Sequence, residues 1–136
     1  MAFFRFQDLR VYQKILEFAR LAEAKVNKAP GLDGVEVFPR ISEAALRAAM
    51  KIAEGASMPK EVFVRQVRES KTFIRECVVL LDYALIKGTI SDAKYAQLIN
   101  ELEEITRMMG ALITSLCHPN NAPANGKNQE DNDWDA

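Results

Sequence analysis

Residues that could act as catalysts or metal ligands are few in this sequence. The single histidine, His118, stands beside Pro119 at the end of an apolar helical pattern, where an imidazole is usually solvated. A di-iron site in a helical bundle needs paired Glu-x-x-His motifs, which one histidine cannot supply. The sequence also lacks a glycine-rich phosphate loop and a serine nucleophile elbow. We therefore expect no catalytic residues, no cofactor, no metal site and no enzymatic activity.

The two cysteines, Cys77 and Cys117, both fall within apolar helical patterns. Neither has neighbours at the spacing of metal ligands, and two cysteines do not make a disulfide framework. We expect both to be reduced, packed thiols.

Basic residues are the most suggestive polar feature, because they recur at helical spacing along two segments. In the first segment the basic residues lie within about 40° of one another on a helix; they are Arg40, Arg47 and Lys51. In the second segment three basic residues share an arc of about 60°, with a fourth about 60° away; they are Arg68, Lys71 and Arg75, and then Arg65. Two such stripes on one side of the protein would suit a phosphate backbone.

The alternative interpretation is that both stripes are ordinary solvated faces. Acidic residues are interleaved with the basic ones and could pair with them at short range; they are Glu43, Glu54, Glu61 and Glu69. Overall charge favours this alternative, since residues 1–118 carry 17 Lys and Arg against 15 Asp and Glu. Repetition of a weak patch around an oligomer would raise its avidity for RNA.

Four segments with helical periodicity must position these residues, and none shows the alternation of a strand. The segments run from about 8 to 26, 39 to 54, 59 to 87 and 91 to 116. Short connections favour antiparallel neighbours, so the sequence predicts an all-α fold, an antiparallel up-down-up-down four-helix bundle.

Residues typical of helix ends mark the boundaries of these segments. Asp8, Ser57 and Ser91 are expected N-caps of the first, third and fourth helices. Gly55 and Gly88 are expected to end the second and third helices in the left-handed conformation.

The bundle is expected to occupy residues 1–118, followed by a tail at 119–136. The tail is rich in asparagine, lacks periodicity, and carries one Lys against four acids, so we expect it to be disordered.

No apolar run approaches the roughly 20 residues that cross a bilayer. The N-terminus reaches Asp8 too early for a signal peptide. We expect a cytoplasmic protein that does not contact membranes.

Residues 77–86 are apolar almost all round the predicted third helix. Three of their side chains fall away from the stripe that faces the predicted core: Val78, Val79 and Ile86. A helix that is apolar on several sides must be covered on several sides. We expect these three residues to form an oligomer interface; the alternative is that this helix lies centrally in its own bundle.

Two motifs resemble the four-helix-bundle proteins encoded in 23S rRNA intervening sequences. The opening Phe6-Gln7-Asp8-Leu9-Arg10-Val11-Tyr12-Gln13-Lys14 is similar to that family's first-helix start, with Tyr12 at a Trp position. The run Arg47-Ala48-Ala49-Met50-Lys51-Ile52-Ala53-Glu54-Gly55 is similar to its second helix. The resemblance spans about residues 6–116. It implies a cyclic homo-oligomer, with a pentamer favoured, and an RNA-linked role. The architecture also resembles the accessory variability determinant of diversity-generating retroelements.

Together these features predict a non-catalytic, homo-oligomeric four-helix bundle that binds RNA or a ribonucleoprotein through its basic stripes. The alternative is a protein–protein scaffold or adaptor that binds no nucleic acid. No small-molecule substrate is evident in the sequence.

Overall fold

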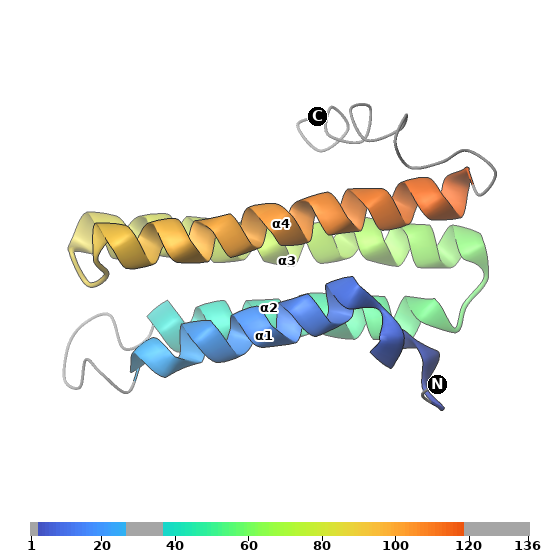
Figure 1. Cartoon of the computed structure of the whole chain (residues 1–136), viewed down its shortest axis with the longest axis horizontal. Coiled ribbons are helices and arrows are strands. Elements are labelled where there is room, and N and C mark those ends of the chain that lie inside the picture. Colours follow the sequence, from blue (N-terminus) through green and yellow to red (C-terminus); the bar gives the residue numbers. More distant parts are fainter. Residues whose placement is uncertain (1–2, 27–36, 119–136) are drawn as a thin grey trace.

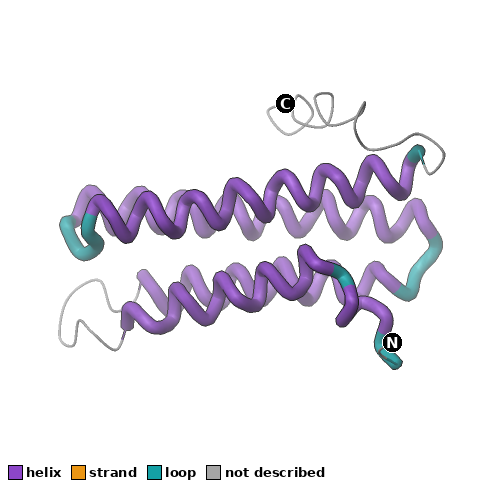
Figure 2. Tube along the Cα trace, viewed as in Figure 1, coloured by secondary structure: helices purple, strands orange, loops and turns teal. Residues whose placement is uncertain are grey.

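A computed structural model describes residues 3–26 and 37–118 of the chain (Figure 1). Within these ranges every regular element is helical and no strand occurs (Figure 2). A short 3₁₀ helix, η1, spans Arg5–Asp8 and is followed by four α-helices. Their bounds are Arg10–Val26 (α1), Val37–Ala56 (α2), Lys60–Lys87 (α3) and Asp92–Cys117 (α4). The expected tail at 119–136 lies outside the described residues.

The four helices lie alongside one another with successive helices antiparallel, as the sequence predicts. Helices α1 and α2 form one layer and α3 and α4 the other (Figure 1). Each helix packs against two neighbours, and the most extensive contact joins α2 to α3. The predicted all-α four-helix architecture is therefore confirmed for the protomer.

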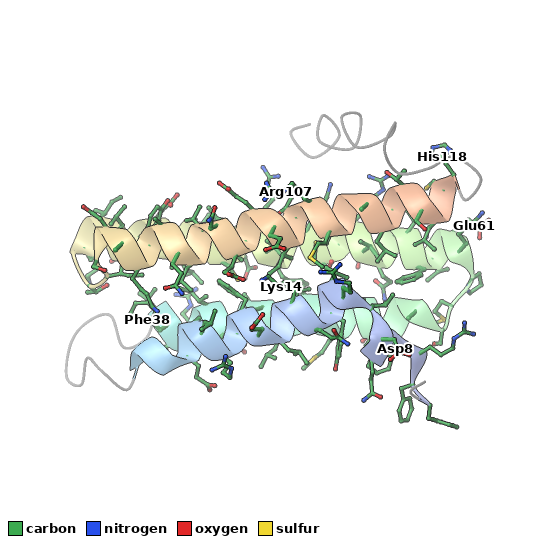
Figure 3. All side chains as sticks on the ribbon, in the orientation of Figure 1. Asp8, Lys14, Phe38, Glu61, Arg107 and His118 are labelled. Carbon is green, nitrogen blue, oxygen red and sulfur yellow. The ribbon has the colours of Figure 1, made fainter. Side chains whose placement is uncertain are left out.

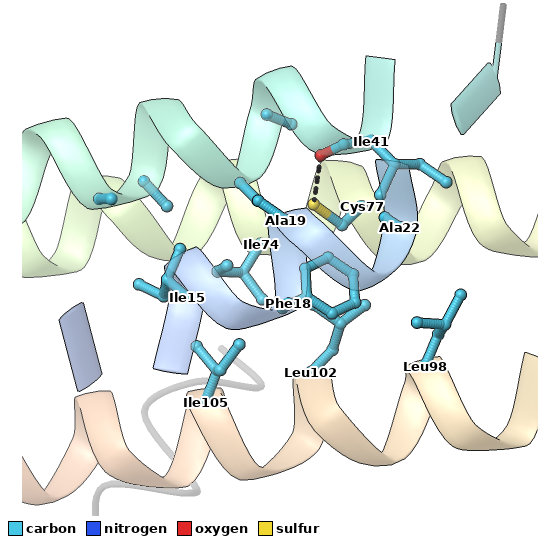
Figure 4. Close-up of a cluster of buried hydrophobic side chains, with 14 of the residues drawn as sticks. Ile15, Phe18, Ala19, Ala22, Ile41, Ile74, Cys77, Leu98, Leu102 and Ile105 are labelled. Carbon is cyan, nitrogen blue, oxygen red and sulfur yellow. Dashed lines mark hydrogen bonds between the residues drawn. The ribbon is translucent and has the colours of Figure 1, made fainter. Parts of the chain in front are cut away.

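All four helices contribute apolar side chains to one continuous core (Figure 4). Phe18 from α1, Ile74 from α3 and Leu102 from α4 are almost wholly buried there. Helix α2 contributes four small residues to the core beside its larger ones, and they are buried: Ala44, Ala45, Ala48 and Ala49. Small side chains allow neighbouring backbones to come close, which accounts for the extensive α2–α3 contact.

Two of the predicted helix ends are present in the structure. The Ser91 side chain accepts a hydrogen bond of 3.0 Å from the backbone N–H of Lys94, so it caps α4. Gly88 adopts the left-handed conformation with φ of 77° and ends α3. Its N–H and that of Thr89 donate to carbonyls of the last turn, which satisfies groups that the helix leaves unpaired.

The other three predicted helix ends were wrong. Asp8 belongs to η1, and α1 begins at Arg10, because packing of Phe6 on Tyr12 places a separate turn ahead of α1. Gly55 lies inside α2 in helical conformation. Ser57 caps nothing; Pro59 precedes α3, and its carbonyl accepts from the N–H of Phe63.

Candidate interaction surface on helices α2 and α3

Two of the three basic residues of α2, Arg40 and Lys51, lie beside α3. Arg47 and Lys51 are each paired with an acid. The Arg47 guanidinium lies 3.1 Å from a carboxylate oxygen of Glu43, one turn earlier on α2. The ammonium group of Lys51 lies 3.1 Å from Glu69 on α3. Local pairing reduces the charge that Arg47 and Lys51 present to a ligand, as the interpretation of ordinary solvated faces anticipates.

Helix α3 presents its arginines to solvent: Arg65, Arg68 and Arg75 are exposed, whereas Lys71 is half-buried. Across the described residues, Arg65 and Arg68 make no ion pair or hydrogen bond through their side chains. Both guanidinium groups therefore keep their full donor capacity for an anionic partner.

The two basic stripes meet at one place, an open groove between α2 and α3. Arg40 from α2 and Arg75 from α3 both line it, and its volume is about 610 Å³. The other lining residues all belong to α3: Thr72, Glu76, Val79 and Leu80. The groove thus combines two cations, one carboxylate and an apolar wall.

The C-terminal half of α3 exposes apolar side chains where the N-terminal half exposes arginines. Val79 is 65% exposed, Tyr83 is 50% exposed and Ile86 is 83% exposed. These three residues lie at steps of four and three, so they share one face of α3 with Arg68 and Arg75. We call this surface, from Arg65 to Ile86, the α3 outer face.

The exposed apolar patch of α3 differs by two residues from the set that we predicted for an oligomer interface. Val78 is half-buried and packs against the core, so it does not join the exposed apolar patch. Tyr83 belongs to the patch but was not predicted. Its spacing from Val79 and Ile86 could have identified it, since residues three and four apart are neighbours on a helix.

A polar cluster between α1 and α4 was also missed. The ammonium group of Lys14 lies 2.8 Å from Glu101 and 3.4 Å from Glu104 (Lys14 is labelled in Figure 3). The hydrogen bond to Glu101 is the main reason that the pKa of Lys14 is raised above its ordinary value. The sequence gives no indication of this cluster, because a lysine on a different helix leaves no local signal.

A second polar contact joins α3 to α4 near their connecting turn. The Tyr95 hydroxyl donates a hydrogen bond of 2.6 Å to the Asp82 carboxylate. This bond to a carboxylate is the main cause of the raised pKa of Tyr95. Both polar contacts join neighbouring helices at the bundle surface, so we assign them to packing of the bundle.

The two cysteines and the histidine occupy different environments. Cys77 is buried, and its Sγ donates to the Ile41 carbonyl at 3.4 Å (Figure 4). Burial, with a smaller contribution from the negative charge of Glu76, raises the pKa of Cys77 to about 12, so this thiol stays protonated at neutral pH. Cys117 and His118 are exposed at the end of α4, so Cys117 is not the packed thiol that we expected.

No group of three or more His, Cys, Asp and Glu residues is placed to hold a metal ion among the described residues. Over the same ranges no helix is both long and apolar enough to cross a membrane.

Comparison of the chain with protein-family models, curated proteins and solved structures gives no match. The exposed arginines, the apolar patch and the groove make the α3 outer face and the groove beside it the candidate site.

Proposed function

We propose that the protein is a non-catalytic assembly module, a homo-oligomeric four-helix bundle that binds RNA or a ribonucleoprotein through the α3 outer face. The observation that carries this proposal is the division of that face along its length. Exposed arginines occupy its N-terminal half, and Val79, Tyr83 and Ile86 occupy its C-terminal half. A face divided in this way offers a polyanion site beside a surface for a second subunit.

The apolar half supports self-association. Soluble proteins rarely leave several large apolar side chains together in water, and such patches usually mark interfaces. The resemblance to the 23S rRNA intervening-sequence proteins independently implies a cyclic homo-oligomer. We propose the same assembly for this chain, with a pentamer as the favoured size.

The cationic half supports contacts with phosphates. Arg65 and Arg68 are exposed and unpaired within the described ranges, and Arg40 and Arg75 add two further guanidinium groups at the groove. Arginine forms bidentate hydrogen bonds with phosphate, and each subunit of a ring would repeat this set.

The rival function is a scaffold that binds another protein and no nucleic acid. The ion pairs of Arg47 with Glu43 and of Lys51 with Glu69 favour it, since they compensate two of the predicted RNA-binding residues. Salt separates the two functions, because counterion release makes RNA binding fall steeply with salt whereas apolar contacts change little.

The first test measures the affinity for a structured RNA by fluorescence anisotropy at several salt concentrations. We expect Arg65→Glu combined with Arg68→Glu to abolish salt-sensitive binding, because two phosphate contacts become two repulsions. The matched control is Arg20→Glu with Arg107→Glu, which changes the net charge equally at exposed positions on α1 and α4. Equal loss in both double variants would mean a nonspecific charge effect. RNA affinity that is unchanged in the α3 variant would exclude this site.

A further inference from the structure

The groove between α2 and α3 has a composition that specifies the kind of segment it can hold. Arg40 and Arg75 supply two positive charges against the single negative charge of Glu76. Val79 and Leu80 form an apolar wall in the same groove. Such a site suits a short segment in which carboxylates flank one large apolar side chain, because each part would find a complementary surface.

The chain itself contains a segment of this kind, after α4. Residues 130–135 read Glu-Asp-Asn-Asp-Trp-Asp and include four acids and the only tryptophan of the protein. Arginine binds carboxylates through charge-assisted hydrogen bonds and stacks on the face of an indole ring. The indole can also cover an apolar group such as that of Leu80.

The length of the intervening chain matches the distance to the groove. His118 and Glu61 lie at the same end of the bundle (Figure 3), and Arg75 is 14 residues further along α3 than Glu61. This separation corresponds to about 21 Å along the helix axis, and crossing from α4 adds about 10 Å sideways, for a direct distance of roughly 23 Å.

Trp134 follows His118 by 16 residues. A flexible chain of that length has a root-mean-square span of about 22 Å and a fully extended one reaches about 55 Å. The effective concentration of a tethered ligand is highest when the span of its linker equals the distance to its site. Arg68 lies two turns before Arg75 on the same side of α3, so cations also line the path to the groove.

We propose that residues 130–135 dock in the α2–α3 groove of their own subunit and compete there with RNA. The carboxylates face Arg40 and Arg75, and Trp134 covers Leu80, which leaves Val79 to the proposed contact between subunits. Docking does not depend on the proposed function, whereas its consequence does: the acidic segment shields part of the cationic surface until phosphates displace it. The near-neutral total charge of residues 1–118 makes such shielding effective, because 15 acids offset most of their 17 Lys and Arg.

Trp134 permits a direct test, because all tryptophan fluorescence of the full chain comes from the segment in question. In the absence of RNA, we expect its emission to be blue-shifted and less accessible to acrylamide than in the isolated peptide of residues 119–136. We expect Arg40→Glu with Arg75→Glu to shift the emission to that of the peptide. Arg20→Glu with Arg107→Glu should leave it unchanged.

A second set of variants leaves the folded helices untouched. Asp131→Asn, Asp133→Asn and Asp135→Asn together should also release Trp134. Reversal of the tail charges by Asp133→Arg and Asp135→Arg, combined with the two glutamate substitutions in the groove, should restore the blue-shifted emission. Emission of the full chain identical to that of the peptide would overturn the proposal. A blue shift that disappears on dilution would also overturn it, since docking would then occur between subunits.

Removal of residues 119–136 tests the consequence for RNA. We expect the truncated chain to bind RNA more tightly than the full chain at low salt, with the difference vanishing as salt rises. If neither chain binds RNA, the proposed function fails while the fluorescence result still decides whether the segment docks. If both bind equally although Trp134 is protected, the competition is refuted.

Discussion

Among single residues, Gly55 illustrates how packing between helices determines a residue type. A Cβ atom placed on Gly55 would lie 2.9 Å from a ring carbon of Phe63 and 2.9 Å from the Cβ of Gln66. Both contacts are shorter than side chains tolerate, and both come from α3. The glycine therefore permits α2 and α3 to approach closely near their connecting turn.

We expect Gly55→Ala to destabilise the protein. Alanine is favoured over glycine in a helix by about 1 kcal/mol, but overpacking of this kind typically costs about 1–3 kcal/mol. The net loss of unfolding free energy should be on the order of 1 kcal/mol, measured by urea denaturation at fixed protein concentration. The exposed position Ala96 on α4 provides the control, because Ala96→Gly isolates the propensity difference. A more stable Gly55→Ala protein would contradict the close approach.

The two glycines also show which residue roles can be predicted from sequence. Gly88 follows an apolar helical pattern and precedes Ser91, so its role as a helix end depends on local chain geometry alone. The role of Gly55 depends on the positions of the Phe63 ring and of the Gln66 side chain on α3. Such a contact depends on how two helices are placed, which local sequence does not specify.

On the scale of elements, apolar periodicity predicted all four helices, and only their ends needed correction. Helix α2 continues through Gly55 to Ala56, two residues beyond the predicted end. Packing at this turn buries Gly55 against α3, so burial overrides the usual preference of glycine to end a helix. Ahead of the N-terminal end of α1, contacts among Phe4, Phe6 and Tyr12 stabilise a separate 3₁₀ turn.

Two serines that look equivalent in sequence should differ in their contribution to stability. Ser91 accepts a hydrogen bond from the N–H of Lys94, whereas Ser57 caps no helix. We expect Ser91→Ala to lower the free energy of unfolding by about 1 kcal/mol, and Ser57→Ala to change it by less than about 0.5 kcal/mol. Urea denaturation of the two variants, with circular dichroism as the signal, provides the comparison. Equal losses would show that Ser57 also caps a helix in solution.

For the whole molecule, helical spacing indicates which residues share a face of one helix but not how the faces of two helices form a surface. Helical spacing groups Arg40, Arg47 and Lys51 on one side of α2. It does not specify that Lys51 lies beside α3, where it pairs with Glu69. The rotation of each helix about its axis results from core packing between helices. An ion pair between two helices, such as that of Lys51 with Glu69, is therefore visible only in the folded bundle.

The exposed apolar surface is also distributed over different helices. Val79, Tyr83 and Ile86 form one patch on α3, and Met50, 59% exposed, lies beside Leu46 on α2. A contact that joins one patch to a different patch on the next subunit is heterologous, and repetition of such a contact gives a ring when the rotation between subunits closes. A contact of the α3 patch with itself would instead give a two-fold dimer.

Lysine substitutions distinguish these assemblies. We expect Val79→Lys to reduce the particle mass to that of the 15.3 kDa monomer in light scattering, because a buried, unpaired ammonium group opposes association strongly. Ser115→Lys, at an exposed position of α4, should leave the mass unchanged. In a ring built from two patches, Met50→Lys should dissociate the particle as well, whereas a two-fold dimer through α3 should tolerate it. A Val79→Lys protein that stays fully assembled would remove α3 from the interface, and a monomeric wild-type protein would exclude self-association altogether.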